Sequence, residues 1–298
     1  MLKYKADLRT LLFMLFTTSL LVIQWNLDNF NPILFVTSLL MAVSVAVIAH
    51  NTNHVAMWKS NILNVLTDYW LTLFYGFPPF AWIPTHNSNH HMYNNRVPDY
   101  TITYRYSEAN NWLTLLTYPS ISGAFQQPPL LEFLKDTRKK NRQKFYYYVS
   151  QIVVLVLYVA VALLWDWKKA LLYIVAPQQM SLFTVLIFNY IQHVHADEES
   201  KWDHSRNFVN RSLNFFLFNN GFHTVHHIHP RQHWSENDSA HEKVKDKINP
   251  VLNEKSLAWY LIRSYLLSPF ISSFGTVSLR LKRMNSSMNS PLRDGTNK

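Results

Sequence analysis

The stretch that decides the fold is His50-Asn-Thr-Asn-His54, which follows directly on the apolar run of residues 32–49. A membrane span needs ~17–25 residues, and this run is long enough to provide one. His50 and His54 are four positions apart, so on a continuing helix their imidazoles lie on one face and can converge on one point. The sequence therefore places a pair of candidate metal ligands at one end of a membrane span.

Two further histidine groups have related spacings. Neighbouring histidines diverge by about a third of a helical turn, so one member of an adjacent pair can serve one metal ion and its neighbour another. Pro84 and Thr85 predict a helix start just before the second group, and Gly221 predicts a break before the third. The second group is HxxxHH, formed by His86, His90 and His91, and the third is HxxHH, formed by His223, His226 and His227.

Four apolar stretches predict four membrane spans, at about residues 11–25, 32–49, 149–165 and 170–192. The connections at 26–31 and 166–169 are too short to hold a domain, so the spans should pair into two helical hairpins. The polar segments 50–148 and 193–275 predict a helical cap that holds the metal site. We therefore expect an all-α integral membrane protein with a single domain over residues 1–298 and a disordered Ser/Asn-rich tail at 284–298.

Basic residues give the orientation of these spans. They lie before the first span, before the third and in the tail, which is one side of the membrane if there are four spans. Lys and Arg are enriched on the cytosolic side, so both termini and the cap should be cytosolic. The net charge of +10 gathers beside apolar runs, which favours attraction to anionic lipids over nucleic-acid binding.

The absence of cysteine restricts the kind of metal site. Without thiolates the chain has no disulfide and no iron–sulfur cluster, so a metal must be bound by His, Asp or Glu. Eight clustered histidines exceed the three or four ligands of a zinc site and suggest two ions. The fourth predicted span ends at His193, which would be a ninth ligand. Asn189 lies one turn before it and could reach a metal directly or through water.

The order of these motifs resembles the membrane fatty acid desaturase/hydroxylase superfamily. The resemblance runs from about residue 50 to 233. It implies a four-span fold with a cytosolic cap, two non-haem irons, and the use of O2 and two electrons to attack an unactivated C–H bond of a fatty acyl chain. The implied iron ligands are His50, His54, His86, His90, His91, His193, His223, His226 and His227.

The resemblance also implies a separate electron donor, either a ferredoxin or a cytochrome-type protein with its reductase. No HPGG haem signature is present, because His229-Pro230 continues with Arg-Gln, so a fused donor is not expected. The three-residue gap in the first motif is more like acyl-lipid desaturases or hydroxylases than acyl-CoA desaturases. Asn51 stands where alkane hydroxylases carry Glu, which leaves the particular reaction open.

Several functions remain compatible with the sequence. Desaturation is favoured, while hydroxylation and oxidative decarboxylation of a fatty acid would use the same centre. From other classes, a membrane zinc lipid hydrolase would leave most of the histidines unexplained. A metal transporter would place its site within the spans. Arg96 and Arg105 are candidate contacts for a substrate headgroup, and no cofactor besides the metals and O2 is indicated.

Overall fold

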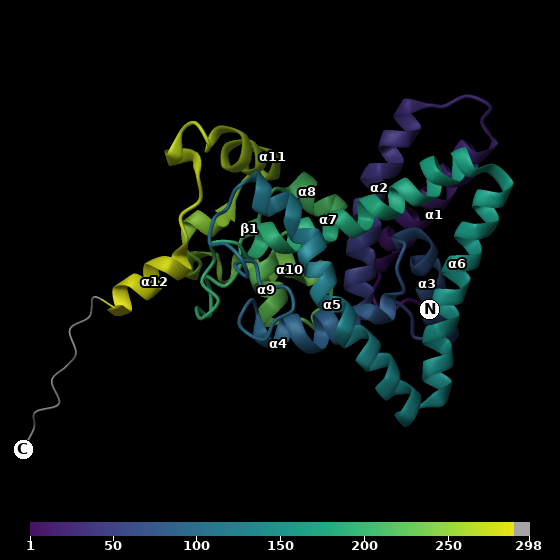
Figure 1. Cartoon of the computed structure of the whole chain (residues 1–298), viewed down its shortest axis with the longest axis horizontal. Helices are drawn as coiled ribbons and strands as arrows, with labels where there is room; N and C mark the ends of the chain where they lie inside the picture. The colour runs from purple at the N-terminus through teal and green to yellow at the C-terminus, as the bar shows by residue number, and fades with distance from the viewer. Residues whose placement is uncertain (289–298) are drawn as a thin grey trace, which may run out of the picture.

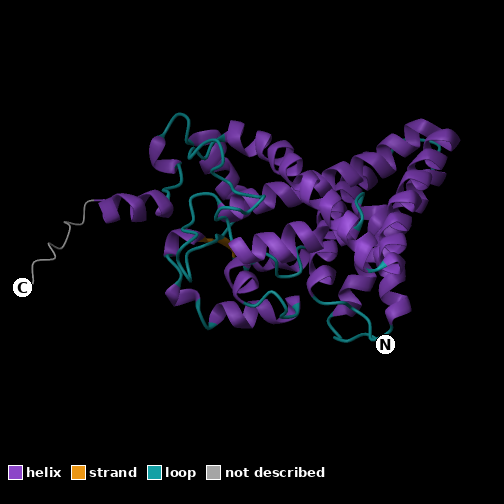
Figure 2. Ribbon diagram, turned by 60° about the horizontal axis from the view of Figure 1, so that its bottom comes forward, coloured by secondary structure: helices purple, strands orange, loops and turns teal. Residues whose placement is uncertain are grey.

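The computed structural model describes residues 1–288, and these are mostly helical (Figures 1 and 2). Helices α1 (Asp7–Asn26) and α2 (Pro32–His54) form the first predicted hairpin. The Asn31 side chain caps α2 by accepting hydrogen bonds from two backbone N–H groups of its first turn. Within the apolar pair, the buried Gln24 side chain donates a 2.6 Å hydrogen bond to Ser38 Oγ, which fixes the two helices against each other.

The second predicted hairpin is one long helical stretch with a bend. It comprises α6 (Arg142–Ala170), the π-helix η3 (Leu171–Val175) and α7 (Ala176–His193). Asp166 has a non-helical backbone (φ −151°, ψ 96°) near the end of α6. Figure 1 shows the chain turning back between α6 and α7. A straight helix of these 52 residues would measure about 78 Å, far more than the ~30 Å core of a bilayer.

Within residues 1–288, three helical stretches are long and apolar enough to cross a membrane. They are α1, α2 and the continuous stretch Arg142–His193, which contains both the third and the fourth predicted spans. The bend at Asp166 is compatible with two crossings. The structure thus gives three candidates where the sequence predicts four spans, and the count of four stays a prediction.

The segment between the hairpins contains α3 (Asn61–Tyr75), η1 (Pro79–Ala81), η2 (Ile83–His90), α4 (His91–Tyr93) and α5 (Trp112–Lys140). Helix α3 ends at Gly76, which has the left-handed backbone (φ 81°) that favours glycine. A Cβ at this position would lie 2.5 Å from Gln178 Cβ on α7, so glycine also allows close approach of these elements.

Short elements make up the rest of the chain. A small parallel sheet pairs β1 (Asn207–Phe208) with β2 (Asn253–Glu254). The helical pieces are α8 (Arg211–Phe216), α9 (His223–Ile228), η4 (Trp234–Glu236), α10 (Asn237–Glu242), η5 (Lys245–Lys247), η6 (Pro250–Leu252), α11 (Leu257–Leu261), η7 (Ile262–Leu267), η8 (Ser272–Phe274) and α12 (Leu279–Met288).

Helix α12 overlaps the first residues of the predicted tail. It continues to Met288, and the rest of the predicted tail lies outside the described residues. Ion pairs attach α12 to the body: Arg283 contacts Asp197 (2.7 Å) and Glu198 (2.9 Å), and Arg280 contacts Glu198 (3.1 Å). The sequence pattern contains no signal for these long-range pairs.

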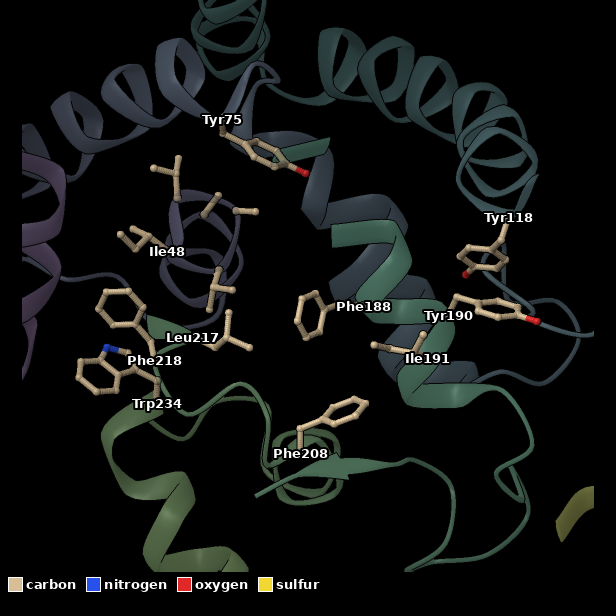
Figure 3. Close-up of a cluster of buried hydrophobic side chains, with 14 of the residues drawn as sticks. Ile48, Tyr75, Tyr118, Phe188, Tyr190, Ile191, Phe208, Leu217, Phe218 and Trp234 are labelled. Atoms are coloured by element: carbon tan, nitrogen blue, oxygen red, sulfur yellow. The ribbon is translucent and has the colours of Figure 1, made fainter. Parts of the chain in front are cut away.

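The main hydrophobic core lies where the ends of α2 and α7 meet the C-terminal elements. Figure 3 shows side chains from both helices, such as Ile48 and Ile191, packing toward Phe208, Leu217 and Phe218. Ile48 and Ile191 are each 1% exposed. This core therefore fixes the helix ends that carry the histidines of the first motif and His193.

Candidate metal centre

All nine predicted ligands come together at these helix ends, in two groups whose ligand atoms lie within 4.8 Å of one another. The groups draw on α2, η2, α4, α7 and α9, which are far apart in the sequence. The first cluster is His50, His54, His86, His91 and His226, and the second cluster is His90, His193, His223 and His227.

In the first cluster the Nε2 atoms face one another. His91 Nε2 lies 3.2 Å from His54 Nε2, 3.0 Å from His86 Nε2 and 3.1 Å from His226 Nε2. A single ring nitrogen donates or accepts only one good hydrogen bond, so these contacts are not satisfied by the imidazoles alone. Nitrogens at about 2.1 Å from a common ion, at right angles to each other, would be roughly 3 Å apart. The spacing thus fits a bound cation.

The second cluster has the same arrangement with four residues. His223 Nε2 lies 3.1 Å from His193 Nε2 and 3.2 Å from His227 Nε2. His90 Nε2 is buried without a hydrogen-bond partner. Such an orphaned nitrogen in a buried polar group is costly unless a ligand satisfies it. The donor set therefore also fits a metal ion, and imidazole nitrogen suits iron, copper and zinc alike.

A π-helix changes how the second motif is shared between the clusters. On an α-helix His86 and His90 would lie on one face. Residues Ile83–His90 instead form η2, whose hydrogen bonds span five residues, so His86 lies on the same face as His91. His90 consequently turns to the second cluster. The predicted helix start at Pro84 is confirmed, because η2 begins at Ile83. The prediction that neighbouring histidines can serve different ions also agrees with the structure, since His90 and His91 belong to different clusters.

Asp99 supports the second cluster from outside. Its Oδ2 accepts hydrogen bonds from His90 Nδ1 (2.9 Å) and Asn95 N (2.7 Å), and its Oδ1 accepts from Thr101 N and Thr101 Oγ1 (2.7 Å each). Burial alone would raise the pKa of Asp99, but His90 and the two hydrogen bonds from Thr101 together lower it. An ionised Asp99 holds the proton of His90 on Nδ1 and leaves Nε2 free to bind a metal.

The loop after α7 fixes His193 in a similar way. His193 Nδ1 donates to the carbonyl of His204 (3.1 Å). The buried Arg206 donates through Nη1 to the carbonyls of Ile191 (2.8 Å) and Val194 (3.0 Å), which satisfies orphaned groups at the helix end. Sequence reasoning missed both loop residues. His204 acts here through its backbone carbonyl, and Arg206 caps α7 only because the fold brings it to the helix end.

Burial keeps the clustered imidazoles in their ligating form. Desolvation, followed by the mutual repulsion of neighbouring imidazoles, holds the pKa values of five clustered histidines well below 6.5. These residues are therefore neutral at physiological pH, as metal binding requires. The five are His86, His91, His223, His226 and His227.

A cavity with a volume of about 250 Å³ lies beside both clusters. His50 and His86 of the first cluster and His223 of the second line it. The rest of its wall comes mainly from α2, α5 and α7. The cavity can thus bring a long apolar molecule against both candidate metal sites.

The other sequence candidates lie as follows. Asn189 lines the cavity and its Nδ2 donates to Tyr118 Oη (2.6 Å), while its role as a metal ligand, directly or through water, stays a prediction. His50 Nδ1 lies 3.0 Å from the side-chain oxygen of Asn51, so Asn51 orients this imidazole. Arg96 pairs with Glu199 at the surface, and Arg105 donates to backbone carbonyls.

Comparison with known proteins gave one finding. A family model described as fatty acid desaturase matches residues 30–267, which is well over half of the chain and includes all nine histidines. Searches of curated proteins and of solved structures gave no significant match.

Proposed function

The chain belongs to the fatty acid desaturase family, and from this premise we propose that it desaturates a fatty acyl chain at the paired histidine clusters. Family membership implies an oxidoreductase with a fatty acyl substrate. The single observation that supports the finer proposal is the convergence of nine imidazoles on two points beside one cavity.

The proposed reaction balances with O2 as oxidant. Two hydrogens leave adjacent carbons and a double bond forms between these carbons. One O2 is reduced to two waters, with two further electrons and two protons from a separate ferredoxin or cytochrome-type donor. Hydroxylation would use the same electrons but place one oxygen atom on the substrate, and oxidative decarboxylation would require the carboxyl group near the clusters.

Two iron ions would be held by the first and second clusters, and they would supply the O2 chemistry. The chain itself performs three tasks. Asp99 and the His204 carbonyl hold the Nδ1 protons of His90 and His193, so that each Nε2 faces its cluster. The core keeps the helix ends in register. The cavity wall excludes bulk water from the reacting carbons.

The membrane setting follows from the same elements. The apolar stretches and the family indicate an integral membrane protein. We propose that it crosses the membrane several times, with four spans. The two termini and the metal centre would lie in the cytosol, where a soluble donor can reach them.

The test is expression in a host with a simple lipid profile, with total lipids and volatiles analysed by gas chromatography–mass spectrometry and metals measured on the purified chain. We expect an unsaturated product and about two irons per chain. His226→Ala should abolish the product, whereas His229→Ala, at an exposed histidine outside both clusters, should not. A product that persists in His226→Ala, or one zinc per chain, would refute the proposal.

A further inference from the structure

The cavity beside the clusters differs in polarity from one part to another. Its middle is apolar, with Val43, Ala46 and Val47 from α2 facing Leu182, Val185 and Leu186 from α7. At the metal end the wall is polar beyond the histidines. Asn189, Gln192 and Asn220 line it there, and each lies within four residues of a clustered histidine. A bound molecule therefore meets apolar walls from α2 and α7 and amide groups at the clusters, while Gln126 and Gln127 line the cavity on its α5 side.

Asn220 is the most informative of these residues. It is 9% exposed and lies three positions before His223 among the residues that line the cavity. Its Oδ1 is buried and has no hydrogen-bond partner among residues 1–288. Its backbone carbonyl already accepts from Gln192 Nε2 (3.0 Å), which fixes the segment. A methylene group against this amide would leave the buried Oδ1 unpaired, whereas an O–H group, such as that of an alcohol or a protonated carboxyl, would donate to it. The metal end is thus suited to the polar end of a substrate.

The route to this end lacks charge. In the described part of the chain, no Lys, Arg, Asp or Glu lines the cavity, and residues 112–131 of α5 and 170–192 contain none. The outer faces beside the cavity are apolar, with Phe125, Leu131 and Phe183 exposed. Gln127, which lines the cavity, is also exposed and marks its open side. This opening therefore faces lipid rather than a charged carrier.

Arg105 is the cation that contacts this part of α5, and it is already engaged. Its guanidinium lies 3.9 Å from the Phe125 ring centroid and donates to the carbonyls of Asp99 and Tyr100. Phe125 is turned by about 100° from Gln126, which lines the cavity. A phosphate of a nucleotide or protein thioester at the opening would thus find no free cation on this wall.

We propose that the substrate is a free single-chain amphiphile, a fatty acid or fatty alcohol, which enters from the bilayer with its polar end first. The oxygen-bearing end would lie against Asn220 beside the clusters, and the tail would occupy the apolar middle. The carbons oxidised are then those next to the polar end, not those in the middle of the chain. This inference rests on the proposed function and specifies its substrate and position.

The test uses two samples of hexadecanoic acid, one deuterated at carbons 2 and 3 and one at carbons 9 and 10, fed to cells that express the chain. We expect the oxidised product to lose deuterium only from the first sample. Asn220→Leu, which keeps the side-chain volume and removes the amide, should lower this product about tenfold. Asn26→Leu, at the exposed end of α1, is the matched control and should not change it.

A binding measurement separates the site from the chemistry. Dodecan-1-ol should raise the melting temperature of the purified, metal-loaded chain more than dodecane does, and Asn220→Leu should remove this difference. Loss of deuterium from carbons 9 and 10, or equal effects of the two ligands, would overturn the inference and leave the proposed function standing. Absence of any oxidised product from either sample would overturn both.

Discussion

Asp99→Asn tests the role assigned to the support of the second cluster. Both carboxylate oxygens of Asp99 accept two hydrogen bonds, whereas an asparagine offers one oxygen and one NH2 group. In the variant, one of the two pairs of hydrogen-bond donors therefore faces the NH2 group, which cannot accept a hydrogen bond. If the amide oxygen serves Thr101, the NH2 opposes His90 Nδ1–H and Asn95 N–H. His90 then gains by moving its proton to Nε2, which blocks metal binding there.

The expected magnitudes follow from these contacts. Loss of an outer hydrogen-bond partner typically lowers metal affinity 10- to 100-fold, or about 1.4–2.8 kcal/mol. With the proton of His90 moved to Nε2, Asn95 N–H remains as a buried donor without an acceptor, which costs about 1–3 kcal/mol in unfolding free energy. Because His90 belongs to the second cluster only, the loss should be selective: iron should fall from about two ions per chain toward about one.

The assay is metal content by mass spectrometry during a titration with a chelator, alongside thermal unfolding. Asp136→Asn, at an exposed position on α5, is the matched control and should behave like the original chain. Full retention of both ions by Asp99→Asn, at the same chelator concentration as the control, would refute the reasoning about the His90 proton.

Three further predictions concern stability. Arg206→Met should lower the unfolding free energy by about 3 kcal/mol, because the carbonyls of Ile191 and Val194 lose their donor. It should also reduce the metal content of the second cluster. An unchanged melting temperature would contradict this prediction. Gly76→Ala should lower the unfolding free energy by more than about 1 kcal/mol, because residue 76 has a left-handed backbone and the new Cβ would lie 2.5 Å from Gln178 Cβ. Gly123→Ala is the control: a Cβ there meets nothing within 4 Å, so the same thermal assay should show no loss of stability. The metal-free chain should lose stability as the pH falls below 6.5. The histidines of the unfolded chain bind protons in this range, whereas the buried clustered histidines of the folded chain have lowered pKa values and stay neutral. A melting temperature that stays constant from about pH 7 to pH 5 would contradict this effect of burial.

The sequence predicts the parts of the site that depend on spacing within one element. In α2 and α9 the four-residue spacing brings His50 together with His54 and His223 together with His227. His226, three positions after His223, belongs to the other cluster, and the sequence does not assign histidines to individual ions. The apolar stretches likewise predict the helices. The spacing of residues and the apolar composition suffice to predict these features, because both are properties of a single segment of the sequence.

The remaining features depend on contacts between distant segments. The π-helix at 83–90 is not visible in the residue types. The sequence predicts that His90 and His91 can serve different ions, but it does not show that His91 is the one that joins His86. Asp99 was one of several carboxylates near the motifs, and only the folded loop shows that it contacts His90. The turn at Asp166 lies inside one long helical stretch, which is why counting apolar runs and counting helices give different numbers of spans.

The two adjacent histidine pairs have a mechanical consequence. His90 and His91 belong to different clusters, and so do His226 and His227. In each pair the Cα atoms are joined by one trans peptide unit, about 3.8 Å long. Two peptide units on different elements thus connect the two clusters, and covalent geometry is far stiffer than side-chain packing. The distance between the two ions would therefore stay nearly constant when the surrounding helices fluctuate in the bilayer. Thermal motion would displace the two sites together and would not separate them.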